Sequence, residues 1–364
     1  MAKRSARQTR IQAFDPEQHP AQLRHLGSIS GPWESLMATV NARLLTIQSS
    51  DATILGAALL TARSATAYVK ISGVLARDTA AYEELVRAVL DYAREKDLAC
   101  VKWESWSGEP WLADLAEQMG FQSLPAPRFT TDASVSIPKF GYVHWSHPAR
   151  YLRTSHYQQS ENFTCAAVSA LAAHGETMSI ATMDRLRTAE LLLWRQATNF
   201  MACEPVGLGL AIAERWPASS VQVSLDTDKP VIVDYYPEVE RGWRGILQAD
   251  SRRRAEATGL PVTSMRMEIS QIHKVLSQGA RVLLLVSLQQ MLGYDVPHWL
   301  LCHGTAGSTE RPVILIEDSW VDVSSGESWV DATCLPIAFQ QLEAMSCLES
   351  DGYRAALILT ESAQ

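Results

Sequence analysis

The first third of the chain alternates between runs of strand-forming residues and stretches with helical spacing. Strands are expected where β-branched and apolar residues lie between short polar turns such as SSDA and ARSA. A helix is expected where a capping pair, Asp78 and Thr79, precedes apolar residues that recur at helical spacing up to Ala93. The expected elements are, in chain order, strands at 42–48, 53–61 and 66–75, the helix from residue 79, a strand at 99–103, a helix at 109–119 and a strand from residue 121. This order predicts a mixed α/β unit that ends near residue 125.

Residues 126–150 have the composition of a connection between domains. Pro127, Pro138 and Pro148 are spread there among polar residues, which is typical of loops. A chain of 364 residues is also too long for one hydrophobic core and suits two domains of roughly 150 to 200 residues. We therefore expect an N-terminal mixed α/β domain with its connecting segment over residues 1–145, and a second domain over residues 146–364.

A cysteine begins a predicted helix in the second domain. Small and apolar residues at 166–173 form a helical run that Gly175 ends. At a helix N-terminus, the helix dipole and the unpaired N–H groups favour a thiolate, so we expect the pKa of Cys165 to be lowered. Gln159, on the incoming loop, can direct its side-chain amide and the Cys165 N–H toward a common oxygen. That arrangement is an oxyanion hole.

Two apolar runs on either side of the turn-rich stretch 304–312 predict an antiparallel hairpin. If the hairpin is centred on Ser308, His298 pairs with Asp318, and paired residues point to the same face with Cβ atoms roughly 5 Å apart. The Asp318 carboxylate would then fix the tautomer of the His298 imidazole. Each residue alone more often has a structural role. Their joint presence with Cys165, in papain-like order, indicates thiol-dependent hydrolysis of an amide.

Composition and charge exclude several classes of function. The net charge is −8, and basic residues gather only at Met1–Arg10 and Arg252–Arg254, which argues against a nucleic-acid partner. No run approaches the length of a membrane span, and the basic opening lacks the apolar region of a secretory signal. The six cysteines form neither CxxC pairs nor a disulfide framework. His298 and His303 would lie on opposite faces of one strand and could not share a metal ion. We expect a reduced, cytoplasmic protein without a metal or a membrane partner.

The second domain resembles the C39-type peptidases, and more closely a C39-like family found fused to a GNAT-type domain. The resemblance spans roughly residues 153–320 and rests on the motifs QQSENFTC (158–165), ELLLWRQATNFM (190–201), EPVGLGLAIAERW (204–216), PHWLL (297–301) and ILIEDSW (314–320). It implies a papain-like fold and catalytic roles for Gln159, Cys165, His298 and Asp318. Two positions depart from the usual family pattern: Ala166 replaces the glycine after the nucleophile, and Ser319 replaces the proline after the aspartate.

The order of elements in the N-terminal domain resembles the GNAT acyltransferase fold. In that fold a loop leading into a helix N-terminus binds the pyrophosphate of acyl-coenzyme A. The corresponding stretch here, residues 75–81, has no glycine, and Asp78 would place a negative charge beside the phosphates. We therefore expect a GNAT-like domain without transferase activity and without a cofactor. Acetyl-coenzyme A is a ligand only under the alternative of a working acyltransferase.

The leading hypothesis is a cysteine peptidase or amidohydrolase that acts on a peptide or a peptide conjugate through an acyl-enzyme at Cys165. One alternative is a non-catalytic, peptide-binding pseudoenzyme. Another is an N-acyltransferase that uses acyl-coenzyme A in the N-terminal domain. The sequence leaves open the natural substrate, the choice between hydrolysis and acyl transfer, and the oligomeric state.

Overall fold

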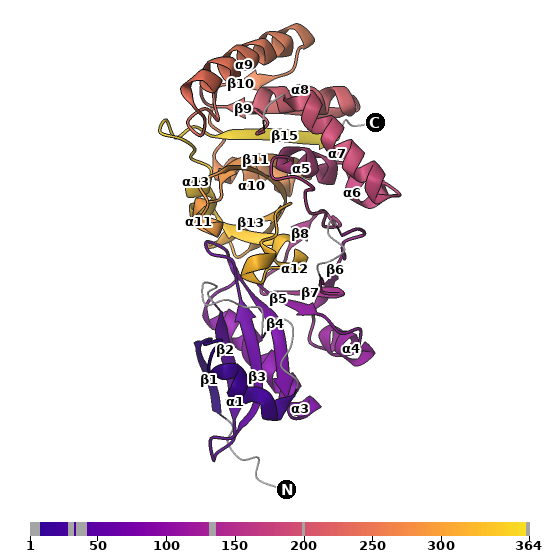
Figure 1. Ribbon diagram of the computed structural model, residues 1–364, viewed down its shortest axis with the longest axis vertical. Helices are drawn as coiled ribbons and strands as arrows, with labels where there is room; N and C mark the ends of the chain where they lie inside the picture. The colour runs from indigo at the N-terminus through magenta and orange to yellow at the C-terminus, as the bar shows by residue number, and fades with distance from the viewer. Residues whose placement is uncertain (1–7, 28–32, 34–41, 131–135, 199–200, 362–364) are drawn as a thin grey trace. The chain divides into compact units, whose positions relative to one another are not determined.

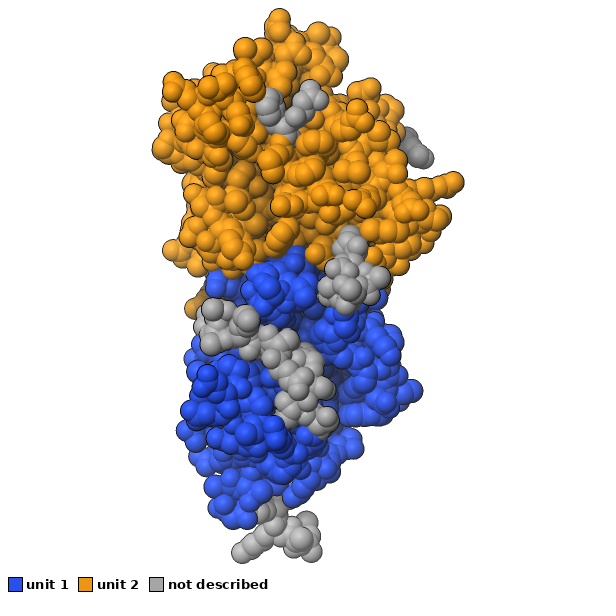
Figure 2. All heavy atoms as spheres, viewed as in Figure 1, with its two compact units in different colours: residues 1–126, 134–148, 321–331 blue, residues 127–133, 149–320, 332–364 orange. Residues whose placement is uncertain are grey.

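The computed structural model describes residues 8–27, 33, 42–130, 136–198 and 201–361, and the chain divides into two compact units (Figure 1, Figure 2). Unit 1 comprises residues 1–126, 134–148 and 321–331, and unit 2 comprises residues 127–133, 149–320 and 332–364. The division after residue 148 lies close to the boundary expected at residue 145. The segment Val321–Asp331 belongs to unit 1 although its sequence lies within the expected second domain, so no single cut through the sequence separates the units.

Unit 1 is built on a mixed sheet in which the described strands follow the order β1-β2-β3-β4-β5-β7-β6. Only β4 and β5 are parallel among these neighbouring strands. The strands are β1 (Gln8–Ala13), β2 (Arg43–Gln48), β3 (Ile54–Thr61), β4 (Tyr68–Ala76), β5 (Cys100–Ser105), β6 (Gln122–Leu124) and β7 (Phe140–Trp145). The helices are α1 (His19–Leu23), η1 (Arg24–Leu26), α3 (Thr79–Glu95), α4 (Pro110–Gln118) and η2 (Val323–Ser325).

The elements expected from β2 to β6 are present in the expected order. Helix α3 begins after Asp78, whose carboxylate accepts a hydrogen bond from the Ala81 N–H, and it buries the apolar residues that predicted it. Residues 126–150 are not only a connection, because β7 lies within them and pairs with both β5 and β6. The expectation of a plain linker was wrong since its prolines lie outside β7, where the run FGYVHW completes the sheet.

A buried cluster of charges holds the segment Val321–Asp331 within unit 1. The Lys70 ammonium lies 2.8 Å from the Glu104 carboxylate and 2.5 Å from that of Asp331, and the Tyr68 hydroxyl donates to Asp331 at 2.6 Å. Burial disfavours the ammonium, but the two carboxylates outweigh it and raise the pKa of Lys70 above its ordinary value. Every charge in this cluster has an opposite charge beside it.

Unit 2 is built on a mostly antiparallel sheet with the order β10-β9-β15-β11-β12-β13-β14, and β8 pairs with β12 beside this path. The strands are β8 (Arg150–Tyr151), β9 (Ser219–Leu225), β10 (Val262–Thr263), β11 (Arg281–Ser287), β12 (Pro297–Gly307), β13 (Pro312–Glu317), β14 (Leu335–Ala338) and β15 (Ala355–Glu361). The helices are α5 (Cys165–Ala173), α6 (Glu176–Ser179), α7 (Met183–Ala197), α8 (Pro205–Arg215), α9 (Glu238–Thr258), α10 (Ile269–Ser277), α11 (Gln289–Leu292) and α13 (Phe339–Met345). The short helix α12 (Trp329–Ala332) ends the segment that belongs to unit 1.

Helix α5 is the central helix of unit 2. All nine of its residues are buried, and its Ser169 hydroxyl donates to the Trp299 carbonyl of β12 at 3.1 Å. A short helix of small residues can be covered on every side because its backbone satisfies its own polar groups. No helix in the described part of the chain is both long and apolar enough to cross a bilayer.

Candidate active site

Cys165 is the first residue of α5 and is 6% exposed. The preceding residue, Thr164, does not cap the helix with its side chain. Its hydroxyl instead contacts the Glu161 carbonyl, at 2.9 Å, and the Glu190 carboxylate. The N-terminal N–H groups of α5 are therefore not occupied by a capping side chain, and the thiol lies where the helix dipole favours an anion.

His298 and Asp318 form a buried pair. His298 is the second residue of β12, Asp318 follows the last residue of β13, and they are 4% and 0% exposed. The His298 Nε2 atom lies 2.7 Å from Asp318 Oδ1, which also accepts the Trp320 N–H at 2.9 Å. With Nε2 directed at the carboxylate, Nδ1 is the ring nitrogen left for a nucleophile.

The predicted direct pairing of these two residues was wrong. Glu317 lies opposite Leu301 in the β12–β13 ladder, and the same register continued by one residue would put Asp318 opposite Leu300. The hairpin is therefore not centred on Ser308. The residue opposite Asp318 is thus two positions away from His298. Because side chains alternate along a strand, His298 and Asp318 still point to the same face.

Two features of the hairpin cause this offset. Pro312 lies opposite Gly307, so residues 308–311 form the loop, and the register shifts between Cys302 and Gly304. The irregularity lies where β8 reaches β12, since Gly304 pairs with Tyr151. A Cβ atom on Gly304 would meet Tyr151 atoms at 2.4 Å, so this close approach requires glycine.

The charge state of His298 depends on its two neighbours. Burial alone would lower the pKa of His298, but the Asp318 carboxylate and the Cys165 side chain, each as a charge and as a hydrogen-bond partner, raise it to about 10. The Cys165 side chain therefore lies close enough to the imidazole to favour its protonated form. The structure brings the predicted nucleophile, base and orienting carboxylate together.

Gln159 lies on the loop before α5 and is 6% exposed. Its side-chain oxygen accepts the Ser319 hydroxyl at 2.8 Å, its Nε2 donates to the Glu161 carbonyl at 2.8 Å, and its N–H donates to the Ser319 carbonyl at 3.0 Å. These bonds fix the orientation of the amide and join the loop to the residue after Asp318. Its role in an oxyanion hole stays a prediction.

Sequence reasoning missed the function of Glu190. This fully buried carboxylate of α7 accepts the Tyr157 hydroxyl at 2.7 Å, the Ser160 N–H at 2.8 Å and the Thr164 hydroxyl. Glu190 therefore holds both ends of the loop that leads to Cys165. The sequence could have indicated this role, because Glu190 falls among the apolar residues that form the buried side of α7. A carboxylate is buried at such a position only where hydrogen-bond donors surround it.

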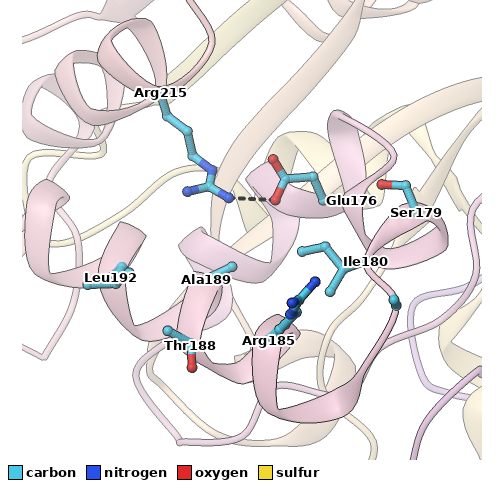
Figure 3. Close-up of a pocket in the computed structure, with 9 residues that line it drawn as sticks. Glu176, Ser179, Ile180, Arg185, Thr188, Ala189, Leu192 and Arg215 are labelled. Atoms are coloured by element: carbon cyan, nitrogen blue, oxygen red, sulfur yellow. Dashed lines mark hydrogen bonds and ion pairs between the residues drawn. The ribbon is translucent and has the colours of Figure 1, made fainter.

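A separate pocket of about 560 Å³ lies among α6, α7 and α8 (Figure 3). Arg215 crosses one wall of this pocket and pairs with Glu176 at 2.6 Å, while Leu192 and Ile180 provide apolar surface. None of the catalytic candidates lines it. Among the described residues, no group of three or more His, Cys, Asp or Glu side chains could hold a metal ion.

Comparison with known families identifies unit 2. A model described as the Peptidase_C39 like family matches residues 154–360, which is more than half of the chain. The chain belongs to this family. The C39-like resemblance inferred from the sequence is thus confirmed, and the match extends beyond residue 320, where the resemblance was expected to end. A comparison with curated proteins gives no match.

The N-terminal region of this C39-like protein matches solved structures of GNAT acetyltransferases. A GNAT-family acetyltransferase from Staphylococcus aureus is 9% identical, with a TM-score of 0.30, and the match covers 38% of this chain and 99% of that one. A putative acyl-CoA N-acyltransferase from Klebsiella pneumoniae is 17% identical, with a TM-score of 0.28 and coverage of 38% and 97%. A spermidine/spermine N-acetyltransferase from Vibrio cholerae is 12% identical, with a TM-score of 0.29 and coverage of 38% and 95%.

Proposed function

We propose that unit 2 is a thiol-dependent peptidase or amidohydrolase that acts on a peptide or a peptide conjugate through an acyl-enzyme at Cys165. One observation carries this proposal: the buried His298 imidazole contacts the Asp318 carboxylate through Nε2, and Cys165, at the N-terminus of α5, lies close enough to raise the pKa of that imidazole. A purely structural histidine needs no cysteine at a helix N-terminus beside it. Membership in the Peptidase_C39 like family supports the same chemistry.

In the acylation half, the Cys165 thiolate attacks the carbonyl carbon of the scissile amide and forms the carbon–sulfur bond. The carbonyl oxygen becomes an oxyanion, and the Cys165 N–H and the Gln159 amide are the donors proposed to stabilise it. The His298 imidazolium then donates its Nδ1 proton to the leaving nitrogen, the carbon–nitrogen bond breaks, and an amine departs. Asp318 holds the imidazole in the required orientation at 2.7 Å.

In the deacylation half, neutral His298 accepts a proton from water while the water oxygen attacks the thioester carbon. Collapse of the second oxyanion breaks the carbon–sulfur bond, releases the carboxylic acid and returns the thiolate beside the imidazolium. An amine in place of water would give the transferred amide instead. The same residues serve both outcomes.

Unit 1 provides less support for an acyl-coenzyme A site. The Asp78 carboxylate caps α3 by accepting the Ala81 N–H at 2.8 Å, so a protein anion already occupies the helix end where a pyrophosphate would bind. We therefore propose no acyl-coenzyme A cofactor for this unit. The proposed reaction belongs to unit 2 alone.

A peptide-library digestion followed by mass spectrometry tests the proposal. The wild type is expected to cleave at least one library member, and Cys165→Ala and His298→Ala are expected to abolish that cleavage. Cys347→Ala, which changes an exposed cysteine, is the matched control and should retain full turnover. Cleavage that survives Cys165→Ala would contradict the proposal, and binding without any turnover by the wild type would favour the pseudoenzyme.

A further inference from the structure

Glu317, the last residue of β13, is a buried carboxylate directly before Asp318. It is 5% exposed, and its two oxygens contact the Thr154 hydroxyl at 3.1 Å, the His156 Nδ1 atom at 3.0 Å and the Thr333 hydroxyl at 3.3 Å. A carboxylate is costly to bury unless hydrogen-bond donors of this kind satisfy it. Glu317 therefore ties two other segments of unit 2 to the position next to Asp318.

Both neighbours of Asp318 in the chain are bonded to the loop 154–164, which leads to the nucleophile. Glu317 binds the start of this loop through two of the contacts given above. On the other side of Asp318, the Ser319 carbonyl accepts the Gln159 N–H at 3.0 Å, and the Ser319 hydroxyl donates to the Gln159 side chain at 2.8 Å. The position of the Asp318 carboxylate relative to the loop is therefore fixed from both sides.

The His156 ring makes its hydrogen bond to Glu317 through one nitrogen. The ring is 4% exposed, and its Nε2 atom is buried and has no hydrogen-bond partner among the described residues. The tautomer with its proton on Nδ1 suits this arrangement, because it directs the N–H at the carboxylate and leaves no buried donor at Nε2. An asparagine side chain, whose amide nitrogen lies near the place of Nδ1, could make the same bond.

We propose that Glu317 and His156 are positioning residues for the candidate active site, and this inference rests on the proposed function. They hold the Asp318 carboxylate 2.7 Å from the His298 Nε2 atom and keep the loop before Cys165 against the same end of β13. A misplacement of about 1 Å in such an arrangement can slow a reaction by about a hundredfold. Both residues act through Asp318 and the loop rather than on the substrate.

Two substitutions of His156 test this role through the limiting reaction of Cys165 with iodoacetamide at pH 6. His156→Leu removes the donor to Glu317 and is expected to slow this alkylation at least about tenfold. His156→Asn keeps an N–H near the place of Nδ1 and should stay within about twofold of the wild type. Equal rates for the two variants would overturn the proposal.

A milder variant covers the case in which His156→Leu does not fold. Thr154→Val replaces the hydroxyl that donates to Glu317 by a methyl group of similar size. The loss of this one hydrogen bond is expected to slow alkylation of Cys165 by about threefold. An unchanged rate in Thr154→Val would count against the proposal.

NMR titration of His298 separates positioning from a general loss of stability. His156→Leu is expected to lower the pKa of His298 from about 10 by about one unit, because the Asp318 carboxylate moves away from the ring. Gln248→Leu is the matched control, since it removes two buried hydrogen bonds to the Val231 backbone on α9 and should leave this pKa unchanged. The same shift in both variants would overturn the proposal. A wild type that cleaves no peptide would contradict the proposed function alone, because neither the alkylation nor the titration depends on turnover.

Discussion

The two units differ in how completely their buried charges are paired. In unit 1 the Lys70 ammonium lies within ion-pair distance of two carboxylates, and the cluster contains no nucleophile. In unit 2 the His298 imidazole has one carboxylate partner, Asp318, and its remaining nitrogen is available to the Cys165 side chain. We call the first cluster closed, because each of its charges is paired, and such a cluster can only stabilise a fold. We call the second cluster open, because one nitrogen is left for a nucleophile, and such a cluster can exchange a proton with it.

The comparison predicts that the two clusters respond differently to mutation. Removing a charge from the closed cluster should reduce stability, because its partners remain buried without compensation. Removing a residue from the open cluster should instead change the pKa of His298 and the reactivity of Cys165. The four variants below test this difference, from the largest expected effect to the smallest.

Lys70→Met is expected to lower the free energy of unfolding by about 3–5 kcal/mol, because the carboxylates of Glu104 and Asp331 then lose their buried counterion. Urea denaturation followed by tryptophan fluorescence measures this loss. Arg94→Met, which breaks an exposed pair with Asp91, is the control and should have no measurable effect. Equal stabilities for the two variants would mean that the cluster does not support unit 1.

Asp318→Asn is expected to lower the pKa of His298 from about 10 by about 1–3 units, because a neutral amide no longer favours the imidazolium. NMR titration of the histidine rings measures the shift. In the wild type, protonation of His298 stabilises the fold fully below pH 6.5, and this contribution is lost as the pH rises through about 10. In Asp318→Asn, the pH range over which protonation of His298 stabilises the fold should therefore end at a lower pH.

His144 is the internal control for the same titration. Burial lowers the pKa of His144, so the direction of its shift is opposite to that of His298. Asp318→Asn should leave it unchanged. An unaltered pKa of His298 in the variant would contradict the assignment of Asp318 as its charge partner.

Glu190→Gln is expected to reduce stability by about 1–3 kcal/mol, since the new NH₂ group faces hydrogen-bond donors of the loop before Cys165. The loosened loop should also slow alkylation of Cys165. Glu161→Gln, on the same loop but in an exposed pair with Arg187, is the matched control. Equal alkylation rates in the two variants would show that Glu190 does not position the nucleophile.

Ser319→Ala is expected to have the smallest effect, about 1 kcal/mol, or roughly a fivefold slower acylation, because one hydrogen bond to the Gln159 amide is lost. Single-turnover kinetics with a cleaved library peptide measures it. Ser160→Ala is the control, since the Ser160 hydroxyl is buried and has no hydrogen-bond partner among the described residues. A rate for Ser319→Ala equal to that of Ser160→Ala would exclude a role in orienting Gln159.

Local sequence patterns were enough to predict much of the candidate site. The helical run after Cys165 and the two apolar runs around residues 304–312 each depend on short stretches of chain, and both elements form as expected. Side chains two residues apart on a strand point to the same face, so an error of two residues in the predicted pairing does not change the face. His298 and Asp318 therefore meet although their predicted direct pairing was wrong.

The remaining features depend on contacts between distant parts of the sequence. The register of β12 shifts where β8 approaches Gly304, and no pattern within the hairpin shows that approach. The segment Val321–Asp331 belongs to unit 1 through contacts with residues far from it in the sequence, such as the ion pair between Asp331 and Lys70. Glu190 likewise reveals its role only through donors about 30 residues earlier in the chain.

The most direct test of the central claim is a limiting reaction with iodoacetamide at pH 6, mapped by mass spectrometry in the wild type and in His298→Ala. Burial raises the pKa of Cys100 to about 12 and also raises those of Cys203 and Cys302, so these thiols should remain unmodified. Selective modification of Cys165, lost in His298→Ala, is the expected result. Modification of all six cysteines to a similar extent, or labelling of Cys165 that persists in the variant, would contradict an assembled thiolate–imidazolium pair.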